Sequence, residues 1–136
     1  MKAIVVGCGR VGSAVAKRLQ GAGWEVAAVD ESEEALERLG EKWPGAFHVG
    51  HGMDVAVLEG AGIADADLVL VATDGDNTNL VVAQIAKLRY DVPKVAVRVQ
   101  DPARAAFYSN RGFDVVSPTT TAIEALAKLA LDGDGS

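Results

Sequence analysis

The sequence has little of what marks secreted, membrane-spanning or nucleic-acid-binding proteins. Its only cysteine is Cys8, so no internal disulfide can form and a reducing, cytoplasmic compartment is expected. No apolar run approaches the roughly 18 residues of a membrane span, and no basic-then-apolar leader follows Met1. The 13 basic and 19 acidic side chains give a net charge of −6 without a lysine or arginine cluster. We therefore expect a soluble intracellular protein that neither binds nucleic acid nor inserts into a membrane.

Signs of internal division are also missing, because the chain has no proline- or serine-rich linker, no repeat and no low-complexity tract. Its 136 residues are about one domain's worth of chain, and 49% apolar with 24% charged residues is an ordinary globular composition. We expect one domain over residues 1–131 and a flexible tail over 132–136 (DGDGS).

Short apolar runs alternate with helical patterns from one end of the chain to the other. Residues 2–7 (KAIVVG) are typical of a strand buried on both faces, and apolar residues over 11–22 follow one helix face. Further strands are expected at 25–30, 46–50, 67–72, 94–99 and 113–116. Further helices are expected from an N-cap at Ser32 to residue 40 or 43, at 54–61, at 77–90, from Pro102, and from the capping box Thr121-x-x-Glu124. This order predicts an α/β fold, a Rossmann-type doubly wound parallel sheet of six strands in the order 3-2-1-4-5-6.

A glycine loop, Gly7-Cys8-Gly9-Arg10-Val11-Gly12, follows the first strand and opens the first helix. In the G-x-G-x-x-G pattern the first glycine allows a tight turn, the second lets a phosphate approach the backbone, and the third lets helix and strand pack closely. The helix N-terminus offers free N–H groups to an anion. A glycine turn without a ligand is the alternative, but the strand and helix around it favour all six residues as a nucleotide-binding loop.

Two spacer positions of this loop carry chemistry of their own. Arg10 starts at the phosphate-binding helix end, so it is either a bidentate clamp on phosphates or a solvated surface arginine. Cys8 is interpreted as a small filler rather than a reactive thiol, although a helix N-terminus does lower a thiol pKa.

Asp30 is the last residue of the second expected strand and comes 18 residues after Gly12. A carboxylate there accepts hydrogen bonds from ribose hydroxyls and repels a 2′-phosphate. Glu31 adds a second negative charge. No arginine that would favour NADP is expected after the strand. The alternative role for Asp30 is a helix cap. We expect an adenosine ligand without a 2′-phosphate.

Other candidate residues follow the later strands, where ligands of doubly wound sheets bind. They are His51 and Asp54 after the third strand, Ala72, Thr73, Asp74 and Asn77 after the fourth, and Arg98 in the fifth. Arg98 lies in an apolar strand and needs a ligand or an ion pair with Asp74 or Asp101. His48 and His51, without a nearby cysteine, make a poor zinc site, so no metal is expected.

Catalytic groups are not apparent. No Ser/His/Asp or Cys/His set converges, and the six strands use up the chain, leaving no substrate domain for hydride transfer. Binding without catalysis is the prediction. Two alternatives stay open: the cofactor-binding module of an NAD-dependent oxidoreductase without its catalytic domain, and a redox sensor that uses Cys8.

From Met1 to about Leu131 the chain resembles the N-terminal nucleotide-binding (RCK/KTN, TrkA-N) domain of Trk/Ktr-type potassium-uptake regulators. The more specific part is AGIADADLVLVATDGDNTN, residues 61–79, and the loop Gly7–Gly12, Val29-Asp30, Val97-Arg98 and GFDVV (112–116) also match. The chain departs from the family pattern at Gly50-His51-Gly52-Met53, where Gly-Asp-Ala-Thr/Ser is usual. The second, C-terminal domain common in the family is not in this sequence, so an excised domain or a short regulator is expected.

The resemblance implies a ligand and partners. The ligand would be NAD(H) or ATP/ADP, with Gly7, Gly9, Arg10 and Gly12 on phosphates and Asp30 on the ribose. Asp54, Ala72 and Thr73 would flank the adenosine, and Arg98 would face the phosphate or nicotinamide end. The domain would lie in the cytoplasm beneath a potassium-translocating membrane subunit, peripheral to the inner face of the membrane.

The last helix is apolar around most of its circumference: only Glu124 and Lys128 form a polar strip, while Ile123, Leu126 and Leu129 spread around the rest. It either lies deep in the core of the monomer or mediates self-association. The family pairs through this region, so the resemblance implies a homodimer or higher ring with Ile123 and Leu126 at the contact.

Overall fold

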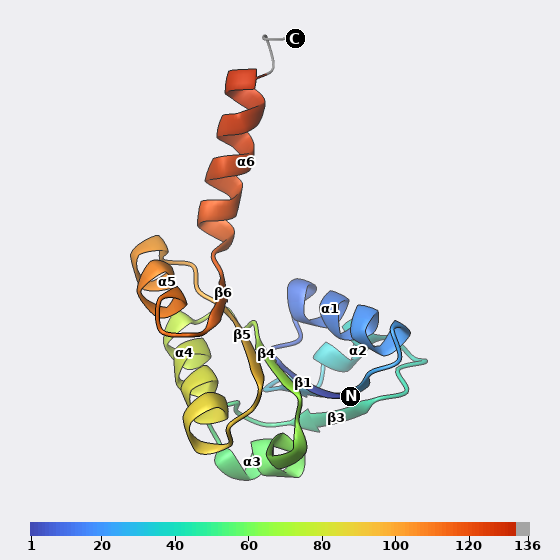
Figure 1. The fold of residues 1–136 in the computed structure, drawn as a ribbon. Coiled ribbons are helices and arrows are strands. Elements are labelled where there is room, and N and C mark those ends of the chain that lie inside the picture. Colours follow the sequence, from blue (N-terminus) through green and yellow to red (C-terminus); the bar gives the residue numbers. More distant parts are fainter. Residues whose placement is uncertain (133–136) are drawn as a thin grey trace.

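Six parallel strands form one sheet in the computed structural model, which describes residues 1–132 (Figure 1). The strands are β1 (Lys2–Val6), β2 (Glu25–Asp30), β3 (Ala46–Val49), β4 (Leu68–Val71), β5 (Lys94–Arg98) and β6 (Asp114–Val116). Their order is β3-β2-β1-β4-β5-β6, with every neighbouring pair parallel. The predicted Rossmann-type fold and strand order are confirmed.

Helices cover both faces of the sheet. They are α1 (Arg10–Gly21), α2 (Ala35–Leu39), α3 (Val55–Gly60), α4 (Asp76–Gln84) and α5 (Pro102–Ser109). A last helix, α6 (Pro118–Asp132), follows β6 and does not cover the sheet. A short 3₁₀ turn, η1 (Ile63–Asp65), precedes β4, and a π-helical turn, η2 (Ile85–Arg89), continues α4. Figure 1 shows α1 and α2 on one side of the sheet and α4 and α5 on the other.

Residues along β1 alternate between two buried clusters, as strand geometry requires. Ile4 and Val6 join the larger cluster with residues of α3, α4 and α5. Ala3 and Val5 join the second cluster under α1 and α2. Because β1 is buried on both faces, its sequence is a continuous apolar run rather than an alternating one.

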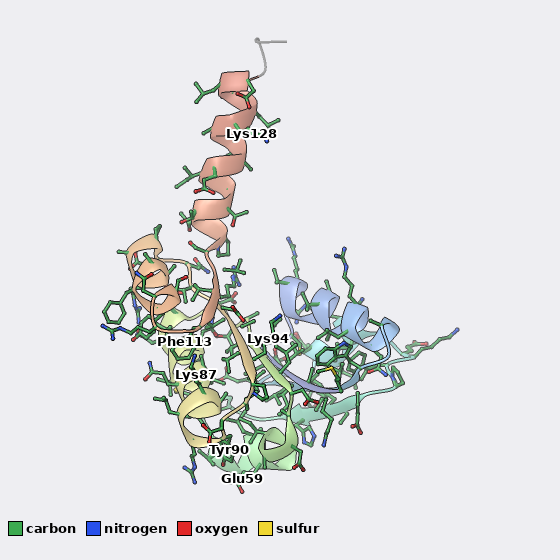
Figure 2. The ribbon with its side chains drawn as sticks, viewed as in Figure 1. Glu59, Lys87, Tyr90, Lys94, Phe113 and Lys128 are labelled. Carbon is green, nitrogen blue, oxygen red and sulfur yellow. The ribbon has the colours of Figure 1, made fainter. Side chains whose placement is uncertain are left out.

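Side-chain contacts at the surface tie α4 and η2 to their neighbours (Figure 2). The Tyr90 hydroxyl donates to Glu59 Oε1 of α3 at 2.7 Å, and this bond raises the pKa of Tyr90. The Lys87 ammonium lies 4.8 Å from the centre of the Phe113 ring. These contacts hold the far end of the α4–η2 helix against α3 and the start of β6.

Two helix boundaries differ from the prediction. The last helix begins at Pro118, so the capping box expected at Thr121 is wrong: the Ser117 hydroxyl accepts a hydrogen bond from the Thr120 N–H, and proline takes the first helical position. The second helix begins at Ala35 and ends at Leu39, because Ser32 closes a separate turn with the Glu34 N–H.

The helix α6 stands away from the sheet (Figure 1), and none of its described residues is buried. Its expected alternative place in the core of the monomer is therefore wrong. Of the predicted tail, Asp132 ends α6 and residues 133–136 lie outside the described residues. No helix within residues 1–132 has the length and apolar character that a membrane span requires.

Candidate functional site

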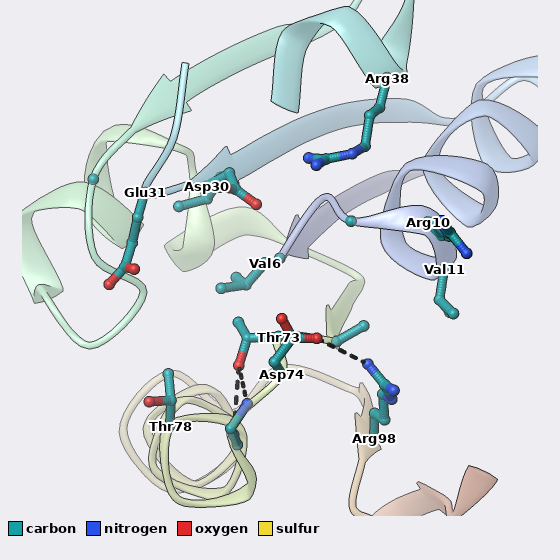
Figure 3. A pocket seen from close by; sticks show the side chains of 16 residues that line it. Val6, Arg10, Val11, Asp30, Glu31, Arg38, Thr73, Asp74, Thr78 and Arg98 are labelled. Carbon is teal, nitrogen blue, oxygen red and sulfur yellow. Dashed lines mark hydrogen bonds and ion pairs between the residues drawn. The ribbon is translucent and has the colours of Figure 1, made fainter. Parts of the chain in front are cut away.

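A pocket of about 680 Å³ opens at the carboxyl ends of β1, β2, β4 and β5 (Figure 3). Its volume lies in the range of about 300–1,000 Å³ that small-molecule sites usually have. The first loop contributes Gly7, Gly9, Arg10 and Val11, and the end of β2 contributes Asp30 and Glu31. Ala72, Thr73, Asp74 and Arg98 complete the set of predicted site residues that line the pocket.

The three glycines of the loop meet different surroundings. Gly7 has a φ of +91°, and a Cβ there would lie 2.6 Å from the Thr73 backbone nitrogen. A Cβ on Gly12 would lie 1.7 Å from the Gly7 carbonyl oxygen, whereas one on Gly9 would meet nothing within 4 Å. Gly7 and Gly12 are therefore required by packing of the protein itself. Gly9 instead leaves open space at the N-cap of α1, where a phosphate could approach the backbone.

The carboxylate of Asp30 joins two loops. Its Oδ2 accepts a hydrogen bond from the Cys8 N–H at 2.7 Å, and its Oδ1 accepts one from the Ser32 N–H at 2.9 Å. Each carboxylate oxygen can accept a second bond, so Asp30 is both a local brace and a pocket acceptor.

The Cys8 thiol is buried below the loop and is not among the residues that line the pocket. Burial first, and the charge of Asp30 second, raise the pKa of Cys8 to about 12, against smaller lowering by a bond to the Val29 backbone and the charge of Arg38. A thiol with this pKa is almost wholly protonated at neutral pH, and reactive cysteines need the thiolate. The geometry does not support the redox-sensor alternative.

Arg98 reaches the pocket from the end of β5. Its Nη1 lies 3.7 Å from Asp74 Oδ1, the ion pair that Figure 3 shows. Asp74 is fully exposed, and Arg98 Nε is buried without a hydrogen-bond partner among residues 1–132. A long pair with a solvated carboxylate satisfies this guanidinium poorly, so Arg98 can still bind an anion.

A buried amide, Asn79 of α4, organises the ends of β4 and β5. Its Oδ1 accepts from the Thr73 N–H at 3.0 Å and from the Thr73 hydroxyl. Its Nδ2 donates to the carbonyls of Thr73 and Arg98, at 3.0 and 2.9 Å. Asn79 belongs to the motif that carried the resemblance, but its place as the brace behind Thr73 was not expected.

Five predicted site residues are outside the pocket lining. Cys8 and Gly12 belong to the glycine loop, but they pack against the protein interior and do not line the pocket. Asp54 caps α3, since its Oδ1 accepts from the Ala56 N–H at 3.0 Å. His51 Nε2 pairs with Glu31 Oε1 at 2.9 Å, and Asn77 Oδ1 accepts from Arg104 at 2.9 Å.

The pocket also includes residues that the sequence did not single out, namely Val6, Val29, Arg38, Gly50, Gly75 and Thr78. Arg38 corrects the expectation that no arginine follows the second strand. It comes eight residues after Asp30, on the short helix α2, which packs beside α1. Arg38 lies beyond the residues that directly follow β2, so the loop sequence alone does not indicate it. The spacing of a helix after β2 would have indicated it.

Comparison with known proteins places these features in a family. Residues 3–118 match the family described as TrkA-N domain. The Trk system potassium uptake protein TrkA of Streptomyces coelicolor is 37% identical over 134 residues, covering 98% of this chain and 60% of that protein. The chain thus spans about 60% of the length of this curated relative.

Two solved structures share the fold. The Kef CTD of Shewanella denitrificans in AMP-bound form superposes with a TM-score of 0.84 at 25% identity, covering 100% of this chain and 83% of that one. The TrkA-N domain of the inner membrane protein ybaL from Escherichia coli gives a TM-score of 0.82 at 18% identity, covering 94% and 95%.

Proposed function

Because the chain belongs to the TrkA-N domain family, we propose that it is the nucleotide-sensing part of a potassium-uptake system. The family is a regulatory and non-catalytic one, in agreement with the prediction that the chain is not an enzyme. The same membership decides against the alternative of a dehydrogenase module that has lost its catalytic domain.

The ligand would be an adenine nucleotide, NAD(H) or ATP/ADP. The observation that carries this proposal is the convergence of the glycine loop and Asp30 on one pocket. Gly9 leaves room for a phosphate at the N-terminus of α1, and Asp30 keeps free lone pairs for ribose hydroxyls. The Shewanella protein, which shares this fold, is in an AMP-bound form, and this supports an adenine nucleotide as the ligand.

Within the pocket each side chain would have a distinct task. Arg10 would contact the phosphates, and Arg98 would face the terminal phosphate or the nicotinamide end. Ala72 and Thr73 would flank the adenosine, with Thr73 held in place by Asn79. Asp54 caps α3 and does not line the pocket, so we assign it no ligand contact.

Regulation would work through differential affinity. A ligand shifts an equilibrium between two states only by the difference in its binding to them. Driving an assembly from 1:99 to 99:1 requires about 5.5 kcal/mol, which several identical sites could share. The partner would be a potassium-translocating membrane subunit, with this domain at its cytoplasmic face. The exposed helix α6 would join two copies of the chain.

Binding of AMP, ADP, ATP, NAD and NADH, measured by calorimetry and thermal shift, tests the proposal. A ligand at 100 times its Kd should stabilise the domain by about 2.7 kcal/mol. Asp30→Ala and Arg10→Ala should each weaken binding without unfolding the domain, because neither side chain is in the core. Unchanged affinity in both variants, or no binding of any of these nucleotides, would refute the proposed site.

A further inference from the structure

Arg38 lies at the end of the pocket where β2 stops. Its guanidinium is directed from α2 toward Asp30, as Figure 3 shows, whereas Arg10 lies on the far side of the glycine loop beside Val11. Within residues 1–132 Arg38 makes no ion pair of 4.0 Å or less with a carboxylate. Its donors are therefore available to a ligand in this part of the pocket.

The two carboxylates that line this end of the pocket, Asp30 and Glu31, both have partners within the protein. Glu31 is engaged by His51 at 2.9 Å, and Figure 3 shows its side chain pointing away from Asp30. The Asp30 carboxylate already accepts two backbone N–H bonds, which disperse part of its charge. At this end of the pocket the Asp30 carboxylate thus stands opposite the Arg38 guanidinium, while Glu31 also lines the pocket but is directed away from Asp30.

A carboxylate in the position of Asp30 marks where the ribose hydroxyls of a bound adenosine lie, and a nearby arginine is what accommodates a 2′-phosphate there. We propose that Arg38 is a specificity-determining residue that lets the pocket hold an adenosine carrying a phosphate on its 2′-hydroxyl. The inference rests on the proposed nucleotide site. The planar guanidinium can donate two parallel hydrogen bonds to phosphate oxygens, which offsets the repulsion from Asp30.

A pair of ligands isolates this contact: 5′-AMP and adenosine 2′,5′-bisphosphate differ only by the 2′-phosphate. Calorimetry at one fixed, low salt concentration should show that the wild-type protein binds the bisphosphate at least as tightly as AMP. In Arg38→Gln the affinity for the bisphosphate should fall about tenfold, equivalent to about 1.4 kcal/mol. Affinity for AMP should change less than about twofold. NADPH and NADH should follow the same pattern.

Two further variants control the measurement. Arg18→Gln removes the same charge from an exposed position of α1 away from the pocket, and should leave the ratio of the two affinities unchanged. Arg38→Lys keeps the charge but loses the two-pronged donor, and should give an intermediate ratio. Arg38 is exposed, so these substitutions leave the core intact.

The possible failures are distinguishable. If AMP binds but the wild-type protein binds the bisphosphate more than tenfold more weakly, the inference is wrong and the proposed function stands. The same holds if Arg38→Gln weakens both ligands equally. If neither ligand binds, and none of the other adenine nucleotides binds, both the proposed function and this inference are wrong.

Discussion

Gly9 and Gly12 belong to one loop but have opposite environments. Gly12 is packed against the Gly7 carbonyl, while Gly9 faces open space. The two positions therefore separate the folding role of the loop from its binding role, and the same substitution at each gives a matched pair.

For this pair we predict different defects. Gly12→Ala should lower the free energy of unfolding by about 1–3 kcal/mol, because its Cβ forces the backbone apart. Gly9→Ala should leave the free energy of unfolding nearly unchanged and weaken nucleotide binding, since its Cβ occupies the space a phosphate would use. Urea unfolding and calorimetry measure the two effects. An equally stable Gly12→Ala protein would contradict the packing argument.

At the scale of elements, the ends of β4 and β5 are joined through α4 by one buried amide. Asn79 makes hydrogen bonds to Thr73 and to the Arg98 carbonyl, so it sets the spacing of two pocket-lining strand ends. The last paired residues of β4 and β5 are Val71 and Val97, so Asn79 bridges the two strands beyond their own pairing.

Replacing this amide should damage stability and binding together. Asn79→Ala leaves several buried backbone groups unpaired, each costing about 1–3 kcal/mol, so we expect a total loss of about 2–4 kcal/mol after local relaxation. Nucleotide affinity should also fall, because Thr73 loses its support. Chemical unfolding and calorimetry on the same samples test both effects. Asp54→Ala is the comparison: it removes a helix cap worth about 1 kcal/mol and should change affinity little. A larger loss of affinity in Asp54→Ala would favour direct ligand contact by Asp54.

At the scale of the whole molecule, α6 is an apolar helix without a covering surface. Ile123 is 59% exposed and Leu126 is 66% exposed, and Figure 2 shows the helix standing clear with Lys128 near its end. A helix with an apolar arc this wide is normally covered, and within residues 1–132 nothing covers it.

We predict that α6 mediates a homodimer with Ile123 and Leu126 at the contact. Light scattering at micromolar concentration should give a mass above the 14.1 kDa of one chain. Leu126→Asp should dissociate the dimer, because it would bury a charge at the contact. Lys128→Asp changes only the polar strip, so the measured mass should stay above that of one chain. A chain ending at Ser117 should be monomeric. The prediction is wrong if the wild-type protein is a monomer, or if the truncated chain forms the same assembly with unchanged stability.

The sequence alone determined those features that depend on local pattern and chain order. Apolar runs alternating with helical periods, together with right-handed crossovers, were sufficient for the strand order. The glycine loop and Asp30 could be placed at one edge of the sheet because strand ends in a parallel sheet share that edge. The family resemblance, carried mainly by residues 61–79, is confirmed.

Only the tertiary structure decided where the side chains near that edge point. Asp54 and His51 follow β3 as expected, but one caps α3 and the other pairs with Glu31. Arg38 reaches the pocket from α2, which packs beside α1, and α6 follows the last strand without burying any of its described residues. These outcomes depend on contacts between residues distant in the chain, which periodicity and spacing do not specify.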